Sequence, residues 1–396
     1  MNLYFIILII LGVGSLIDIF SENREFKRNI YIFLIGILVA FFGTRGYIGY
    51  DWYSYMPSFE NSQNIIELVK NGFIAGGFEK GFQVYCAGIK LFTDNYLIFN
   101  FINTLIDFII LYFIFKRYSK YPIFALFIYF GVYGVAFEID MIRNLKSILL
   151  FILSIKYIED RKIMPFIALN LLGFFFHSSS LIYFPMYFLL KINWNRLFIF
   201  VVFILGNIYY LLDKRLIIKN IGSLANMLPG SIGKKVSVYI SIVPDYFPLG
   251  VTLFYLERII IFILVFLMLN RLSEKRYGTI FANSLFLSVF IFLFGAEFSV
   301  LTLRIGILFV YSYWFILPML VDLEDMLPIK VGVLILALGI SYFRLDNQIN
   351  FIGNRKLYQY ENIFLEHKGA EERRKMVVDS FKYLKQGHGK ELSLLY

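Results

Sequence analysis

Four arginines stand where long apolar runs of the sequence begin or end, and each could bind a phosphate. Arg45 follows one run, Arg143 and Arg304 each open another, and Arg258 lies about one turn inside a further run. A guanidinium group offers phosphate oxygens a planar fork of N–H donors. Charged side chains next to membrane helices are costly and usually face a partner or a cavity. Together the four arginines predict a cavity for an anionic head group such as a diphosphate.

Titratable side chains accompany these arginines. His177 lies in a turn with three serines between two apolar runs, and histidine exchanges a proton near neutral pH. Asp51 follows Arg45, and Glu297 precedes Arg304. A structural alternative stays open in each case, because the acids could simply neutralise the arginines and the histidine could be a packing residue. In the same way, the two acids of segment 138–140 could neutralise Arg143.

The segment after Arg45 is rich in glycine and aromatic residues, which suits a sugar. Its aromatic side chains include Tyr50, Trp52 and Tyr55. Aromatic rings offer a flat apolar face with a defined charge distribution, and such a face can stack on a sugar ring. The alternative is an aromatic belt at the membrane interface, in which an Arg–Asp pair folds the loop.

The composition argues against a metal centre or a disulfide framework. The chain has one cysteine and three histidines, and it contains neither a CxxC nor an HxxxH pair. We therefore expect no protein-built metal site and no cofactor. The formal charge of +10 is compatible with ordinary membrane topology, and no nucleic-acid partner is expected.

The elements that must position these residues are apolar helices. The chain is 59% hydrophobic and 17% charged, with a mean hydropathy of +0.70, whereas a soluble domain is about 45–50% apolar and about 25% charged. The excess lies in blocks long enough to cross the hydrocarbon core. We predict an all-α polytopic membrane bundle of about 11–12 helices. The candidate spans are 2–20, 29–44, 96–115, 121–137, 145–158, 164–176, 179–190, 197–212, 252–269, 279–297, 305–320 and 328–343.

Basic residues between the spans predict the orientation. Five clusters of lysine and arginine all fall on the cytoplasmic side if the N-terminus is outside and the half-hydrophobic stretch 81–93 does not cross fully. This topology gives a membrane domain over 1–343 with outer loops 44–80 and 213–251, followed by an extramembrane tail over 344–396. The lysines and arginines of loop 213–251 could bind anionic head groups, although long loops escape the charge rule. The arginines and His177 then share the outer face.

Several short elements, in this order, resemble a known family. Arg45 followed by Gly49-Tyr50-Asp51 and Tyr55 looks like the Arg…Gly-x-Asp…Tyr element of EpsG-like and Wzy-type O-antigen and exopolysaccharide polymerases. Further matches to that family are Glu79-Lys80-Gly81-Phe82, Ile142-Arg143-Asn144, Phe176-His177-Ser178-Ser179-Ser180-Leu181 and Arg304-Ile305-Gly306 with Tyr311. The sequence departs from the family pattern at Asn144, where a glutamine is usual, and at Lys146, where a small residue is common.

The resemblance implies a GT-C-like glycosyltransferase of the bacterial inner membrane, with its active site facing the periplasm. Such an enzyme joins undecaprenyl-diphosphate-linked repeat units into O-antigen, capsule or exopolysaccharide and releases undecaprenyl diphosphate. It would need no metal, and a direct displacement would invert the anomeric centre. The implied partners are the lipid-linked glycan donor and acceptor, membrane lipid and, as a candidate, a chain-length regulator protein.

The resemblance also implies roles for the residues introduced above. Arginines would stabilise the departing diphosphate, and a carboxylate or histidine would deprotonate or orient the acceptor hydroxyl. The expected diphosphate ligands are Arg45, Arg143, Arg304 and Arg258. The candidate bases are His177, Asp51, Glu79 and Glu297, and the aromatic residues Tyr50, Trp52 and Tyr55 would contact sugars.

Two other functions stay open at the level of sequence. An O-antigen ligase would need a similar arginine-lined outer cavity, although the ordered motifs favour a polymerase. A flippase or transporter of lipid-linked oligosaccharide would also place charges inside the membrane. Transporters commonly show paired halves with broken helices, and the sequence shows one candidate break, near 177–180.

Overall fold

The computed structural model describes residues 2–74, 77–212, 250–323, 326–351, 353–365 and 367–385. Within these ranges the regular elements are helices, and one isolated antiparallel bridge joins Arg45 to Asn362. The predicted all-α fold class is confirmed. Apart from its last two positions, the predicted loop 213–251 lies outside the described residues.

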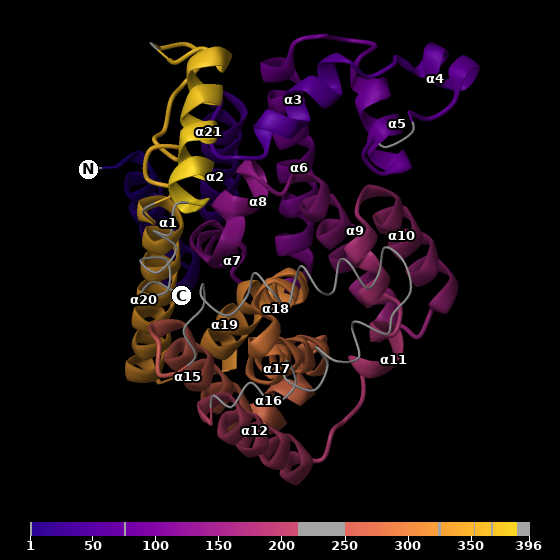
Figure 1. The fold of residues 1–396 in the computed structure, drawn as a ribbon. Coiled ribbons are helices and arrows are strands. Elements are labelled where there is room, and N and C mark those ends of the chain that lie inside the picture. The colour runs from indigo at the N-terminus through magenta and orange to yellow at the C-terminus, as the bar shows by residue number, and fades with distance from the viewer. Residues whose placement is uncertain are drawn as a thin grey trace. The chain divides into compact units, whose positions relative to one another are not determined.

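The chain divides into two compact units, which are described separately (Figure 1). The first consists of Met1–Tyr187 and Tyr313–Phe381, and the second of Phe188–Ser312 and Lys382–Tyr396.

Seven helical segments of the described residues are long and apolar enough to cross a membrane, so the chain is a multi-pass membrane protein. They are α1 (Leu3–Phe20), α2 (Arg24–Gly43), α6 (Tyr96–Tyr118), α7 with α8 (Pro122–Ile139), α17 with its 3-10 extension (Gly278–Phe298), the segment Thr302–Leu323, which ends in α19, and α20 (Leu327–Asn350). Four further predicted spans correspond to shorter or more polar helices. These are α9 (Ile142–Glu159), α10 (Ile163–Phe176), α12 (Arg196–Leu211) and α15 (Leu253–Leu267), and whether they cross stays a prediction.

In the first unit, α1 packs on α7, α2 on α6, and α9 on α10, while α20 lies against α1 and α7 (Figure 1). The segment between α7 (Pro122–Tyr129) and α8 (Val135–Ile139) breaks at 130–134, where Tyr133 has a φ of 71°. A Cβ on Gly131 would lie 2.3 Å from the Ser341 Cβ of α20, so only glycine allows this crossing. Trp314 Nε1 donates to the Val132 carbonyl at 3.2 Å and thereby supplies a partner at the break.

The second unit is built around α17 (Gly278–Gly295). Helices α12, α15 and α16 (Leu269–Glu274) pack on α17, and α18 (Ser299–Gly306) folds back on its end. Aromatic stacking joins α12 to α15, since the ring centroids of Phe203 and Phe262 are 3.8 Å apart. These contacts bury apolar side chains between the helices of the second unit.

The stretch 81–93 is predicted not to cross the membrane fully, and its short helix is compatible with that prediction. It contains α5 (Lys80–Ile89), which has 10 residues. At about 1.5 Å per residue α5 reaches about 15 Å, roughly half of the hydrocarbon thickness. The predicted span 179–190 does differ from the structure, which has a 3-10 helix over Ser178–Tyr183 and then the short α11 (Met186–Leu189). Pro185 explains the break, because it has no backbone N–H with which to continue the helical hydrogen bonds.

The predicted tail 344–396 packs on the loop after α2, and its first residues continue α20. Helix α20 continues to Asn350, and α21 spans Ala370–Lys385. Between them, the Glu361 carbonyl accepts from Gly46 N at 2.9 Å, and the Leu357 carbonyl accepts from Gly49 N at 3.0 Å. The loop after α2 and the tail therefore lie at the same end of the first unit.

Arg373 is the anchor of the tail. It is 1% exposed, and its guanidinium pairs with Glu361 at 2.7 Å. It also donates to the carbonyls of Lys356 at 3.1 Å and Gln359 at 2.9 Å. Breaking a buried ion pair by removing one partner typically costs about 3–5 kcal/mol.

We therefore expect Arg373→Ala to loosen the tail by about 3 kcal/mol, at the low end of that range because Lys368 still contacts Glu361. Amide hydrogen exchange of the purified protein should show faster exchange over 353–385. The matched control is Arg374→Ala, since Arg374 is an exposed neighbour paired with Glu371 at 3.6 Å. Equal protection of the tail in both variants would contradict the role given to Arg373.

Candidate functional site

Three segments that are distant in the sequence meet at Arg143 in the first unit. Arg143 stands at the start of α9 and forms an ion pair with Glu79, which immediately precedes α5. Its Nε donates to the Tyr55 hydroxyl at 3.4 Å, and Tyr55 belongs to α3 (Trp52–Glu60). The guanidinium carbon lies 4.1 Å from the centroid of the Phe78 ring, a cation–π contact. The structure thus brings together Arg143, Glu79 and Tyr55, which were predicted from separate motifs.

The His177 turn joins the same cluster. Glu79 Oε1 accepts from the Ser178 backbone N–H at 3.4 Å, so one carboxylate bridges Arg143 and this turn. The Ser179 hydroxyl lies 2.6 Å from His177 Nδ1 and 3.3 Å from Asn144 Oδ1. Asn144, which replaces the glutamine usual in similar sequences, therefore still makes a side-chain contact within the cluster.

Glycine lets α5 reach this position. A Cβ on Gly81 would lie 2.7 Å from both the Cβ and the carbonyl oxygen of Phe175, near the end of α10. Any larger residue would push α5 away from α10 and separate Glu79 from the His177 turn. The glycine of the Glu-Lys-Gly-Phe segment thus has a packing role that follows from the fold.

Sequence reasoning missed the part played by Asp140. Its Oδ1 accepts from the backbone N–H groups of Tyr50 at 2.7 Å and Asp51 at 3.0 Å, while Tyr358 in the tail donates to Oδ2. Burial raises the pKa of the Asp140 carboxyl, and these hydrogen bonds oppose the rise. Asp140 had been interpreted as a neutralising partner for Arg143. The signal available in the sequence was a glycine-rich turn whose backbone N–H groups need a hydrogen-bond acceptor. Nothing in the sequence indicated which acidic residue supplies that acceptor.

The predicted diphosphate ligand Arg45 has a different environment. It is 3% exposed and donates to the Glu138 carbonyl at 2.6 Å and to the Thr104 hydroxyl at 3.2 Å. These contacts join the end of α2 to α6 and α8. Arg45 therefore has a structural role in this arrangement. The predicted contact of Arg45 with diphosphate stays a prediction.

A buried ion pair lies deeper along α9 and was not predicted. Lys146 Nζ is 2.6 Å from Asp107 Oδ1 in α6, with side-chain exposures of 5% and 0%. Asp107 also accepts from Asn103, whose Oδ1 accepts from the Tyr85 hydroxyl of α5 at 3.1 Å. An aspartate inside an apolar run was the signal that could have revealed this pair. The network holds α5, α6 and α9 together beneath Arg143.

The predicted sugar contacts are largely packed within the protein. Trp52 and Tyr55 are each 3% exposed, and the Tyr50 hydroxyl donates to the Gly353 carbonyl of the tail at 2.8 Å. Asp51, by contrast, has an exposed side chain. The aromatic side chains of this loop therefore pack within the protein and support the cluster around Arg143.

The remaining predicted residues belong to the second unit. Glu297 is 5% exposed and accepts from the Tyr209 hydroxyl. Arg258 donates to the Phe254 carbonyl at 2.9 Å and lies 4.1 Å from the centroid of the Phe292 ring. Arg304 is exposed in the last turn of α18. Their predicted roles stay predictions.

The turn at Gly49 provides a test of how the loop is held. Gly49 has a φ of +83°, and an added Cβ would lie 2.3 Å from Asp140 Oδ1. Gly72 also has a positive φ, of +79°, but an added Cβ there meets nothing within 4 Å. Gly49→Ala should therefore lower the melting temperature of the purified protein more than Gly72→Ala does. The backbone strain alone costs about 1–3 kcal/mol in either variant. Equal losses would show that the Asp140 contact does not constrain the turn.

Comparisons with known proteins agree with the order of the motifs. The family model of the EpsG family matches residues 28–362. This range contains the whole cluster around Arg143, the Asp140 turn and the segment with Arg304. Searches among curated proteins and among solved structures find no match for the chain.

Proposed function

The chain belongs to the EpsG family, and on that premise we propose that it polymerises undecaprenyl-diphosphate-linked oligosaccharide repeat units. At the coarser level, family membership gives a polysaccharide-polymerase type of role, that is, a glycosyltransferase activity in a multi-pass membrane protein. The finer proposal specifies the lipid carrier, the periplasmic face of the inner membrane and the release of undecaprenyl diphosphate. The product would be O-antigen, capsule or exopolysaccharide.

The observation that carries this proposal is the Arg143–Glu79–His177 cluster. The side chains of Arg143 and Glu79 are 19% and 24% exposed, so a ligand can reach both, whereas Arg45 is almost fully buried. A partly buried cation is suited to a leaving diphosphate, because the low local dielectric strengthens its attraction to the developing charge. The proposed mechanism assigns this stabilisation to the guanidinium and uses no metal ion.

Glu79 is the proposed general base. It already pairs with Arg143, and a diphosphate that binds Arg143 would compete for that guanidinium and leave the carboxylate beside the acceptor. The acceptor hydroxyl oxygen would then attack the anomeric carbon while its proton passes to Glu79. The bond between that carbon and the diphosphate oxygen breaks, and the electron pair leaves with undecaprenyl diphosphate. Such a single displacement inverts the anomeric centre.

His177 and Asp51 are proposed to orient the acceptor. His177 is linked through Ser179 to Asn144, next to Arg143, and so lies within the cluster. Asp51 stands at the turn held by Asp140, with its side chain exposed. Both would bind sugar hydroxyls. A lipid-linked glycan donor, a lipid-linked acceptor and a chain-length regulator protein are the proposed partners.

We expect Arg143→Ala and Glu79→Gln each to lower the rate of glycan elongation by about 100–1,000-fold, because each removes charge that acts in the transition state. The assay uses the purified protein in nanodiscs with lipid-linked repeat units, and glycan lengths are resolved on a gel. Arg28→Ala and Glu25→Gln are matched controls, since they alter an exposed arginine–glutamate pair at the start of α2. A normal ladder of lengths from Arg143→Ala would sink the assignment, and movement of lipid-linked glycan without elongation would favour a flippase.

Arg304→Ala tests the second unit independently. If Arg304 binds diphosphate, long-chain product should disappear while the protein still inserts and keeps its melting temperature. An exposed arginine with no ligand role would tolerate the change, because exposed ion pairs contribute only about 0–1 kcal/mol. Wild-type elongation by this variant would restrict the site to the first unit.

A further inference from the structure

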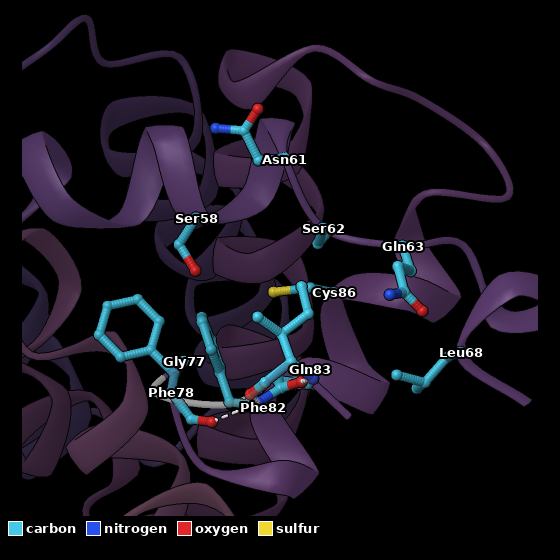
Figure 2. Close-up of a pocket in the computed structure, with 11 residues that line it drawn as sticks. Ser58, Asn61, Ser62, Gln63, Leu68, Gly77, Phe78, Phe82, Gln83 and Cys86 are labelled. Carbon is cyan, nitrogen blue, oxygen red and sulfur yellow. Dashed lines mark hydrogen bonds between the residues drawn. The ribbon is translucent and has the colours of Figure 1, made fainter. Parts of the chain in front are cut away.

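A pocket of about 150 Å³ lies between α3, α4 (Ile65–Asn71) and α5 in the first unit (Figure 2). Figure 2 shows amide and hydroxyl side chains around it, together with the rings of Phe78 and Phe82. Its lining residues are Ser58, Asn61, Ser62, Gln63, Leu68, Ile74, Gly77, Phe78, Phe82, Gln83 and Cys86. None of the predicted site residues lines this pocket.

The chemistry of the lining suits an uncharged polyhydroxylated ligand. Its described residues are amides, hydroxyls, a thiol, glycine and apolar side chains, so an ionic ligand would find no counter-charge among them. Burial raises the pKa of the Cys86 thiol to about 12, which keeps this group neutral as well. Amides and hydroxyls pair with sugar hydroxyls, while aromatic rings cover the apolar face of a sugar.

Gln63 marks where such a ligand would bind. Its Oε1 is buried and accepts no hydrogen bond from the residues that the structure describes. Buried polar atoms are nearly always paired, so this acceptor in the pocket wall needs a donor from outside the protein, either a water molecule or a ligand hydroxyl. A sugar hydroxyl supplies that donor without bringing a charge.

The pocket is held open before any ligand binds. Gln83 Oε1 accepts from Ile74 N at 3.0 Å, and Gln83 Nε2 donates to the Phe78 carbonyl at 2.7 Å. At the far end of α5, Lys90 Nζ donates to the Glu60 carbonyl at 2.7 Å. A cavity of about 150 Å³ accommodates a six-membered ring, and larger sites of about 300–1,000 Å³ are typical of bigger ligands. The volume therefore corresponds to one sugar residue.

Phe78 places this pocket next to the proposed chemistry. Its ring lines the pocket and also lies under the guanidinium of Arg143, and Glu79 is the next residue along the chain. In a lipid-linked glycan the first sugar is bonded to the diphosphate, so sugar and phosphate must occupy neighbouring positions. We propose that the pocket binds one uncharged sugar residue of the glycan and thereby selects repeat units; this rests on the function proposed for Arg143.

The test is a kinetic comparison of Gln63→Leu with Asn71→Leu in the purified full-length protein in nanodiscs. Asn71 lies exposed at the end of α4 outside the pocket, so its replacement adds a similar apolar side chain to the same region. With lipid-linked repeat units, Gln63→Leu should raise KM about tenfold and leave kcat within about twofold, because a hydrogen bond made in ground and transition states is lost. Ser58→Ala should change KM in the same direction by a smaller factor.

A second readout separates this proposal from the proposed function. Binding of the delipidated repeat-unit oligosaccharide is measured calorimetrically on wild type, Gln63→Leu and Asn71→Leu, with melting temperatures to confirm folding. If Gln63→Leu is the only one of the three proteins that binds the oligosaccharide more weakly, the subsite is supported even without elongation. If the wild-type protein then shows no elongation, that result counts against the proposed function and not against the subsite. Equal KM and equal oligosaccharide affinity in all three proteins would overturn the subsite and leave the function standing.

Discussion

The ion pair between Arg143 and Glu79 is the interaction on which the candidate site depends. It joins the start of α9 to the short helix α5, and through Ser178 it also fixes the turn after α10. Helix α5 is held elsewhere by its close approach to Phe175 at Gly81, by the bond from Tyr85 to Asn103 and by the bonds of Gln83. Because a half-buried charge without its partner is costly, the pair holds three segments in register.

A second set of contacts supports the first from the tail side. Asp140 binds the backbone of the Gly49–Asp51 turn and the Tyr358 hydroxyl, and it lies three residues before Arg143. The same turn leads into α3, whose Tyr55 contacts Arg143. The C-terminal segment thus reaches the site through Asp140 and is part of its framework. The family match extends to residue 362 and so includes Tyr358 of this segment.

Sequence reasoning was most reliable where physical chemistry acts locally. Long apolar blocks predicted membrane helices, and the short apolar stretch 81–93 predicted a short element, which is the 10-residue α5. Motifs also selected Arg143, Glu79 and His177 correctly as neighbours. Partner choice over long separations was not predictable. Asp140 binds a turn some 90 positions earlier, and Lys146 pairs with an aspartate in another helix. The break between Tyr183 and Met186 was missed because an apolar run outweighed the signal from Pro185.

Two arginines in similar sequence contexts show why position in the sequence alone could not assign the site. Arg45 and Arg143 both stand next to membrane helices, yet Arg45 donates to carbonyl and hydroxyl groups that belong to the fold itself. Those partners cannot leave without breaking the backbone contacts that join α2, α6 and α8. Arg143 instead pairs with one carboxylate, that of Glu79, and its guanidinium lies over the ring of Phe78.

A carboxylate and a phosphate offer a guanidinium the same pair of oxygen acceptors, so an incoming diphosphate can take the place of Glu79 with little rearrangement. The exchange would also release Glu79 at the moment when a base is needed. In the proposed mechanism, Arg143 and Glu79 form a pair without ligand and act as separate groups when diphosphate is bound.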